Sequence, residues 1–234
     1  FNNGGQGGGG TGNFDNPAGS GTANTGGGGG GASVGGNASG AGGSGIVVVR
    51  YLNAAGTVSR HTITANGNVV NSRAQEKIGT SSIKFDGTGD YLSIPNSSDF
   101  NFGTGDFTFE GWFYTDSATD QVLFSQYQDA SNRWYLRLDN RSAQEGIGFY
   151  NHNGGIDIEA TDSTWPGVNQ WVHMAFVRAS GVITIYINGS AITLKTNTSP
   201  NGTFTNNTGT LRIGDYNGGS NYSGYIDDIR ISNS

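Results

Sequence analysis

Glycine is concentrated at the start of this chain, and no other feature of the sequence limits its fold so strongly. Of the 42 glycines in 234 residues, 21 lie among the first 45 residues, which hold a single charged residue, Asp15. The other 21 are spread over the remaining 189 residues. The chain therefore has two compositional zones, and we expect an extended glycine-rich segment over residues 1–45.

Two arrangements are open for this segment. A flexible linker is the simpler one, because glycine loses more conformational entropy on ordering than any other residue. Extended or polyproline-II-like glycine strands can instead pack backbone to backbone, since only glycine fits such crowded axes. We favour an ordered segment that packs against itself, against sister chains or against a partner.

Four consecutive β-branched residues, Ile46 to Val49, follow the glycine-rich segment and predict a buried strand. We expect residues 46–60 to form a connecting strand that leads into a domain over residues 61–234. The chain begins at Phe1 rather than at Met, so we expect a processed product or a fragment of a longer protein.

From residue 61 onwards, short apolar stretches at regular spacing predict a β-sandwich. Apolar and polar residues alternate, so each strand buries one face. The Asn188-Gly189 pair predicts a type I′ hairpin turn. Ile226 and Ile229 have opposite parity in the last strand, which predicts a bulge at Asp227-Asp228.

Charge and composition exclude several partners. The net charge is −6 and the 12 basic residues form no cluster, whereas nucleic-acid binding needs a concentrated positive face. No apolar run reaches the length of about 18 residues that a membrane helix needs. The absence of cysteine excludes disulfides and thiolate zinc sites. We therefore expect no nucleic-acid partner and no membrane span.

Five stretches, in order, resemble laminin-G-like, concanavalin A-like lectin domains. They are residues 82–95 (SIKFDGTGDYLSIP), 100–112 (FNFGTGDFTFEGW), 170–178 (QWVHMAFVR), 186–189 (YING) and 224–231 (GYIDDIRI). The resemblance covers roughly residues 61–234 and implies an all-β jelly-roll sandwich of two antiparallel sheets. It also implies an extracellular or virion-surface role in binding glycans or proteins. Family members have an apolar strand ahead of the FDG motif, and residues 46–51 are the candidate for that strand.

Two stretches also resemble bacteriophage tail and virion structural proteins: residues 26–51, which end in GGSGIVVVRY, and residues 102–107 (FGTGDF). This resemblance favours a non-catalytic virion or fibre protein whose lectin-like domain recognises a host-surface glycan or protein receptor. Other virion proteins would be its partners, and a homotrimer is the expected assembly. The alternatives are a bacterial extracellular adhesin, a carbohydrate-binding module of a larger secreted protein, or a structural decoration protein without a ligand.

Catalytic chemistry is not indicated. Glycoside hydrolysis needs two carboxylates across a sugar, and the glucanases that this fold also hosts carry Glu-x-Asp-x-x-Glu or Glu-x-Asp-x-Glu on one strand. The four glutamates, at positions 76, 110, 145 and 159, lie in no such pattern. Asp157 and Glu159 share one side of a strand, which alternation assigns to a solvated outer face. No phosphate-loop motif occurs, so we expect no enzyme activity.

Calcium is the one cofactor that the resemblance suggests, because the family often holds a structural calcium near these motifs. Ca²⁺ prefers carboxylate and carbonyl oxygens, and the candidate ligands are Asp86, Asp90, Asp227 and Asp228. Adjacent carboxylates at positions 227 and 228 repel each other unless a cation, an arginine or backbone donors compensate. The alternative is that one accepts backbone hydrogen bonds and the other is solvated.

Three loops combine aromatic and polar side chains in the way that ligand sites do. The expected ligand-binding residues are Tyr127 and Arg133, then Tyr150 and His152, and then Tyr216, Asn217, Asn221 and Tyr222. Loop 216–222 is the strongest candidate because it is glycine-rich and carries two tyrosines. Tyrosine and asparagine are also common in ordinary turns. We expect Trp112 and Trp171 to be packing residues and His173 to be a buried structural histidine.

Overall fold

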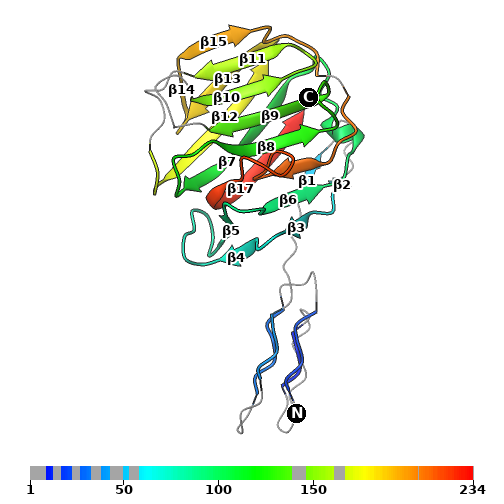
Figure 1. Ribbon diagram of the computed structural model, residues 1–234, viewed down its shortest axis with the longest axis vertical. Helices are drawn as coiled ribbons and strands as arrows, with labels where there is room; N and C mark the ends of the chain where they lie inside the picture. The colour runs from blue at the N-terminus through cyan, green and yellow to red at the C-terminus, as the bar shows by residue number, and fades with distance from the viewer. Residues whose placement is uncertain are drawn as a thin grey trace. The chain divides into compact units, whose positions relative to one another are not determined.

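The structure is a computed structural model that describes residues 9–12, 17–22, 27–32, 38–42, 50–52, 58–138, 146–160, 167–204 and 206–233 (Figure 1). The chain divides into two compact units, Phe1–Val48 and Val49–Ser234. In the described part of the chain, the secondary structure is β-sheet apart from one 3₁₀ helix, η1 (Ser98–Phe100). No helix there is long and apolar enough to cross a membrane.

The described parts of the first unit are short glycine-rich segments joined by backbone hydrogen bonds. Gly19 donates its N–H to the carbonyl of Thr11 and accepts from Gly30, whose own carbonyl accepts from Gly40; all three distances are 2.9 Å. A Cβ atom on Gly10 would lie 1.9 Å from the Gly19 carbonyl oxygen, so a larger residue cannot fit there. The segment thus packs against itself, which is one of the arrangements that the sequence left open.

The second unit is an antiparallel sandwich built from two sheets. The eight-stranded sheet has the order β15 (Leu194–Thr198), β11 (Ile156–Ala160), β10 (Ile147–Asn151), β9 (Arg133–Leu138), β8 (Gln121–Tyr127), β16 (Leu211–Ile213), β6 (Tyr91–Ile94) and β3 (Thr64–Asn66). The seven-stranded sheet has the order β14 (Ser190–Ala191), β13 (Val182–Ile187), β12 (Trp171–Ala179), β7 (Phe107–Thr115), β17 (Ser223–Asn233), β5 (Ser82–Asp86) and β4 (Val70–Ser72). The predicted all-β sandwich of two antiparallel sheets is confirmed.

Most of the strand that we predicted at residues 46–51 lies outside the described residues. Ile46 to Val49 lie outside the described residues, and β1 (Arg50–Leu52) pairs with β2 (Val58–Arg60) in a two-stranded sheet of its own. Ahead of the FDG motif, β3 pairs with β6 at one edge of the eight-stranded sheet, and β4 pairs with β5 at one edge of the seven-stranded sheet. Short strands therefore do precede the FDG motif in both sheets, and the strand at Ile46 to Val49 stays a prediction.

The core lies between the two sheets and is rich in phenylalanine, as the alternation predicts. Phe107 of β7 contacts Phe149 of β10 at 5.8 Å between ring centroids, and Phe109 contacts Phe124 of β8 at 5.6 Å. Trp134 is also buried, and its indole N–H donates to Gln126 Oε1 at 3.0 Å. Burial of such side chains contributes about 1.5–3 kcal/mol each to stability. Because the apolar side chains point inward, the alternate residues of each strand lie on the two outer faces.

Arg178 is a charged side chain that the core surrounds; it is only 1% exposed. Its guanidinium donates to the carbonyl oxygens of Gly103 (2.8 Å), Gly105 (2.7 Å) and Gly202 (2.9 Å). The group also lies 4.7 Å from the ring centroid of Phe107. Burial lowers the pKa of Arg178 while Asp106 opposes the shift. Arg178 therefore fastens two loops to the end of the sandwich through backbone carbonyls.

Two local predictions are confirmed. The β13–β14 turn has positive φ at both Asn188 (48°) and Gly189 (80°), which a type I′ turn requires. In β17 the pairing with β7 shifts register between Asp227 and Arg230, and Asp228 has φ 45°. The parity change around Asp227 therefore does mark a β-bulge.

Candidate functional site

The outer face of the eight-stranded sheet carries a group of aromatic rings that come from three strands and one loop. Tyr135 of β9 lies directly opposite Tyr150 of β10, with their rings stacked at 5.1 Å and an interplanar angle of 26°. Tyr216, after β16, approaches Tyr135 at 4.8 Å and Tyr127 at 5.7 Å. We call Tyr127, Tyr135, Tyr150 and Tyr216 the tyrosine face. β8, β9 and β10 lie side by side in Figure 1 and form its base.

A tight turn holds Tyr216 in place. Tyr216 and Gly219 exchange backbone hydrogen bonds of 2.9 and 3.0 Å, and the two residues between them, Asn217 and Gly218, have φ of 49° and 90°. The buried carboxylate of Asp215 accepts from Gly218 N at 2.9 Å and forms an ion pair with Arg212. Because Asp215 binds the backbone of the turn, the Tyr216 ring is held in position without a ligand.

A pocket of about 200 Å³ opens beside the stacked rings. It is lined by Arg133, Tyr135, Tyr150, Asn151, His152, Gly155, Ile156 and Asp157. Arg133 Nε and Asp157 Oδ1 are shielded from solvent and have no hydrogen-bond partner among the described residues. Unused donors and acceptors beside aromatic rings are what a polyhydroxylated ligand can pair with.

Of the two carboxylates beside the pocket, Glu159 has two cationic partners, whereas Asp157 Oδ1 has no hydrogen-bond partner among the described residues. Arg137 lies 3.7 Å from Glu159, donates to the Tyr150 hydroxyl at 3.2 Å and sits 4.9 Å from the Tyr150 ring centroid. Lys195 lies 3.8 Å from Glu159 on its other side. Burial, and then the charge of Glu159, raise the pKa of the Asp157 carboxyl, whereas Arg137 opposes the shift. Burial likewise raises the pKa of the Tyr150 phenol, so this hydroxyl stays protonated at neutral pH.

Several of the predicted ligand residues meet on this surface. Tyr127, Tyr150 and Tyr216 belong to the tyrosine face, and Arg133 and His152 line the pocket. Asn217 is exposed at the tip of the turn, and Asn221 donates to Asp215 at 3.3 Å. What sequence reasoning took for three separate loops is thus largely one surface.

Tyr222 differs from the expectation of an exposed loop residue. Its side chain is fully buried, its ring meets Phe85 edge-on at 5.7 Å, and its hydroxyl donates to the Tyr225 carbonyl at 3.3 Å. The signal was present in the sequence, because Tyr222 has the same parity as the inward-facing Ile226. Tyr222 therefore supports the core, where a surface ligand does not reach it.

Tyr135 is a site residue that the sequence did not single out, and Asp157 is one that the sequence assigned only to a solvated outer face. Alternation places both on the outer face, but only strand register aligns Asp157, Tyr150 and Tyr135 in one row. Trp112 and Trp171 also differ from the expectation. They are partly exposed on the outer face of the seven-stranded sheet. His173, directly opposite Trp112, is half-buried and lies 3.5 Å from Glu110.

The four candidate calcium ligands lie in two places and have protein partners. Asp90 accepts from Asp86 N at 2.8 Å, and Asp227 accepts from Lys77 N at 3.0 Å and Ile78 N at 2.9 Å. Asp228 pairs with Arg230 at 3.2 Å. Within the described ranges no three His, Cys, Asp or Glu side chains are grouped as a metal site. These contacts fit the hydrogen-bonded alternative, and calcium binding stays a prediction.

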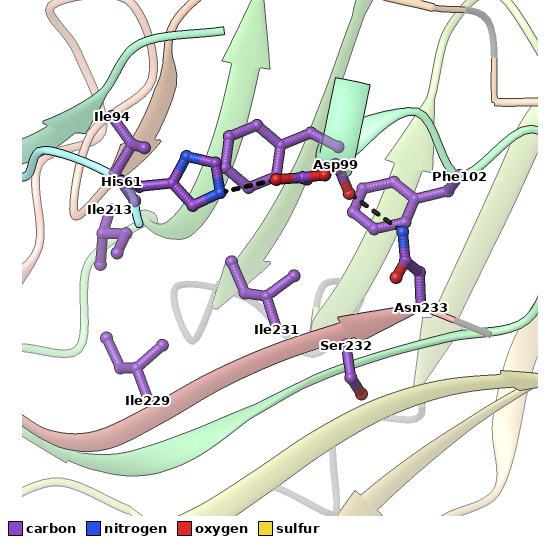
Figure 2. Close-up of a pocket in the computed structure, with 10 residues that line it drawn as sticks. His61, Ile94, Asp99, Phe102, Ile213, Ile229, Ile231, Ser232 and Asn233 are labelled. Atoms are coloured by element: carbon purple, nitrogen blue, oxygen red, sulfur yellow. Dashed lines mark hydrogen bonds and ion pairs between the residues drawn. The ribbon is translucent and has the colours of Figure 1, made fainter. Parts of the chain in front are cut away.

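A second recess, shown in Figure 2, lies between the sheets and is almost entirely apolar. Ile94 and Ile213 from one sheet and Ile229 and Ile231 from the other line it. The His61–Asp99 ion pair, at 3.1 Å, lies beside it. Its free space is about 20 Å³, enough for about one water molecule. It is a packing gap rather than a ligand site.

Comparison with solved structures shows the same fold at low sequence identity. Domain 4 of an extracellular arabinanase from Geobacillus stearothermophilus, solved with arabinotriose, has a TM-score of 0.60 at 18% identity, over 80% of this chain and 93% of that one. The binding domain of botulinum neurotoxin serotype D/C has a TM-score of 0.54 at 14% identity. A structure of botulinum neurotoxin type C, whose cell entry depends on two ganglioside molecules, has a TM-score of 0.51 at 16% identity. Each of these two alignments spans 80% of this chain and about half of the toxin chain (48% and 47%).

No curated protein matches the chain by sequence. The family model of the concanavalin A-like lectin/glucanases superfamily (Laminin_G_3) matches residues 86–234, which is well over half of the chain. The match covers the tyrosine face, the pocket beside it and all but the first three strands of the sandwich sheets. The chain belongs to the concanavalin A-like lectin/glucanases superfamily.

Proposed function

We propose that this chain is a non-catalytic, extracellular carbohydrate-binding module or adhesin domain that binds an oligosaccharide on the tyrosine face. One observation carries the proposal: stacked tyrosines flank a 200 Å³ pocket in which Arg133 and Asp157 have unused hydrogen-bonding atoms. Sugar rings place their apolar faces on aromatic rings, and their hydroxyl groups pair with such donors and acceptors.

The comparisons support this proposal by analogy of fold. An arabinanase domain of the same fold was solved with arabinotriose, and a toxin domain of the same fold belongs to a protein that interacts with gangliosides. The first is one domain of an extracellular enzyme, and the second comes from a toxin whose cell entry depends on gangliosides. They favour the secreted-module interpretation over the virion interpretation, which rests on the resemblance of residues 26–51 and 102–107 alone.

A glycan array on the purified chain tests the proposal. We expect selective binding that is lost in Tyr135→Ala and Tyr216→Ala and retained in Tyr186→Ala, a matched tyrosine on the opposite sheet. Binding that persists in both tyrosine-face variants would contradict the proposed site. An absence of binding to every glycan would contradict the function and favour a purely structural role.

Two further proposals are tested with the same material. Calcium at the candidate aspartates predicts that EDTA lowers the midpoint of thermal unfolding, and an unchanged midpoint would contradict it. A homotrimer, expected if the chain belongs to a virion fibre, predicts three times the monomer mass by light scattering. A monomer in solution would remove that argument for the virion role.

A further inference from the structure

A second group of aromatic side chains lies on the outer face of the seven-stranded sheet. Trp171 of β12, Tyr114 of β7, Tyr225 of β17 and Lys84 of β5 form a continuous cross-strand row, each directly opposite the next. Trp171 and Tyr114 are 5.6 Å apart between ring centroids, and Tyr114 and Tyr225 are 5.7 Å apart. Directly opposite residues share one face of a sheet, so these rings form a strip across the sandwich.

A wide, open hollow of about 630 Å³ adjoins this strip. It is lined by Lys77, Trp112, Trp171, His173, Asn188 and Gly189. The Asn188 side chain accepts from His173 N at 3.0 Å, which fixes the type I′ turn at the rim. Asp227 accepts the backbone N–H groups of Lys77 and Ile78, and so holds the loop that carries Lys77 over the sheet. The hollow is therefore built from positioned elements.

The free charges along this strip are positive, although the whole chain carries a net charge of −6. Lys77 Nζ lies 4.2 Å above the Trp112 ring centroid, and Lys84 Nζ lies 5.7 Å from the Tyr225 ring centroid. Neither lysine lies within ion-pair distance of a described carboxylate. Asp86, whose pKa Lys84 helps to lower, accepts from Thr88 N and Asn68, Glu110 faces His173, and Asp227 accepts from backbone donors. The Trp171 indole N–H also lacks a hydrogen-bond partner in the described structure.

We infer that this face is a second binding site, which takes an oligosaccharide bearing carboxylate or sulfate groups. The sugar rings lie along Trp171, Tyr114 and Tyr225, and their anionic groups bind Lys77 and Lys84. Cations held over aromatic rings suit this ligand, because the rings bind sugar faces while the ammonium groups pair with the anionic substituents. The tyrosine face differs, because its cations Arg137 and Lys195 are already paired with Glu159, and Arg133 shares its pocket with the carboxylate of Asp157. The inference does not depend on the proposed function.

Calorimetric titration with three probes tests the inference: a galacturonic acid tetrasaccharide, its methyl ester and a heparin tetrasaccharide. We expect the first, the last or both to bind and the neutral ester not to bind, with affinity falling as salt is added. Binding of only one of the two anionic probes distinguishes a carboxylate from a sulfate ligand. Lys77→Gln and Lys84→Gln should each weaken binding about three- to tenfold.

Two matched variants serve as controls. Lys195→Gln removes a lysine from the opposite sheet, and Tyr150→Ala removes a ring of the tyrosine face; both should leave the affinity for the anionic probe unchanged. The inference is overturned if no anionic probe binds, if the affinity survives both Lys77→Gln and Lys84→Gln, or if Tyr150→Ala abolishes it. It is also overturned if those two lysines mediate only self-association, seen as a concentration-dependent mass that Lys77→Gln abolishes.

Discussion

The two outer faces of the sandwich have the same backbone frame and different chemistry. The tyrosine face has a narrow pocket lined by the cation Arg133 and the carboxylate Asp157, and the cations beside it, Arg137 and Lys195, are paired with Glu159. The opposite face has a wide hollow and two lysines that stand over rings without carboxylate partners. The difference shows how one fold can present two kinds of recognition surface, because alternation frees every second residue of each strand from the core.

Both faces belong to one sandwich, and the buried Arg178 is the side chain whose loss should destabilise that sandwich most. Arg178→Met leaves the carbonyls of Gly103, Gly105 and Gly202 without their donor, so we expect a loss of about 3 kcal/mol in the free energy of unfolding. For a chain of this size this lowers the thermal midpoint by about 6–12 °C. Arg230→Met, which changes an exposed arginine, should have almost no effect. Equal midpoints for the two variants would contradict this role of Arg178.

A pair of tyrosine substitutions, one on each face, separates the two surfaces. Tyr150→Ala should weaken binding of the neutral oligosaccharide found on the array by about tenfold or more, since a ring at the centre of a site carries much of its binding energy. Tyr225→Ala should leave that affinity unchanged and weaken binding of the anionic probe instead. Calorimetry with both ligands on both variants measures this. Parallel losses in the two variants would mean that the faces are not independent.

The turn that carries Tyr216 offers a smaller test. Asp215→Asn retains the shape of the side chain but weakens its ion pair with Arg212 and its hold on Gly218. We expect about a threefold loss of affinity for the neutral ligand, because the ring is then ordered only on binding. Binding of the anionic probe should not change. A neutral-ligand affinity equal to that of the unmodified chain would show that the turn needs no support from Asp215.

The smallest expected effects concern the two carboxylates beside the pocket. A carboxyl whose pKa is raised on folding binds a proton more readily in the folded state, so its contribution to stability is lost as pH rises from below about 4 through its folded pKa. Asp157→Asn should therefore stabilise the fold at neutral pH by a few tenths of a kcal/mol. Glu159→Gln should destabilise it by a similar amount, because Glu159 pairs with Arg137 and Lys195. Denaturant unfolding at acidic and neutral pH measures both; changes of the same sign in the two variants would contradict the assignment.

Much of the architecture could be predicted because period and parity are local. Alternation indicated which residues of β7, β9 and β13 face inward, and parity alone located the bulge at Asp227. The site was harder to predict because it depends on register and on the packing of distant loops. Tyr135, Tyr150 and Asp157 are aligned by pairing between β9, β10 and β11, and Tyr216 joins them from a turn 59 to 81 residues further along the chain.

Residues with both apolar and polar character account for the remaining differences. Tyr222 is buried with its hydroxyl bonded to a carbonyl, whereas Trp112 and Trp171 are partly exposed beside lysines or other rings. Tyrosine and tryptophan carry one polar group on a large apolar ring, so they are found both in cores and at surfaces. Residue type therefore does not decide where such a side chain lies, and strand parity is the better guide.

The most direct test of the central claim is a backbone-amide NMR titration of the full chain with the neutral oligosaccharide that binds best on the array. We predict saturable shifts in β9, β10, the start of β11 and the turn at residues 215–219, with β12 and β17 unaffected. Saturable shifts confined to β12, β7 and β17 would move the carbohydrate site to the other sheet. An absence of shifts at millimolar ligand would contradict carbohydrate binding by the tyrosine face.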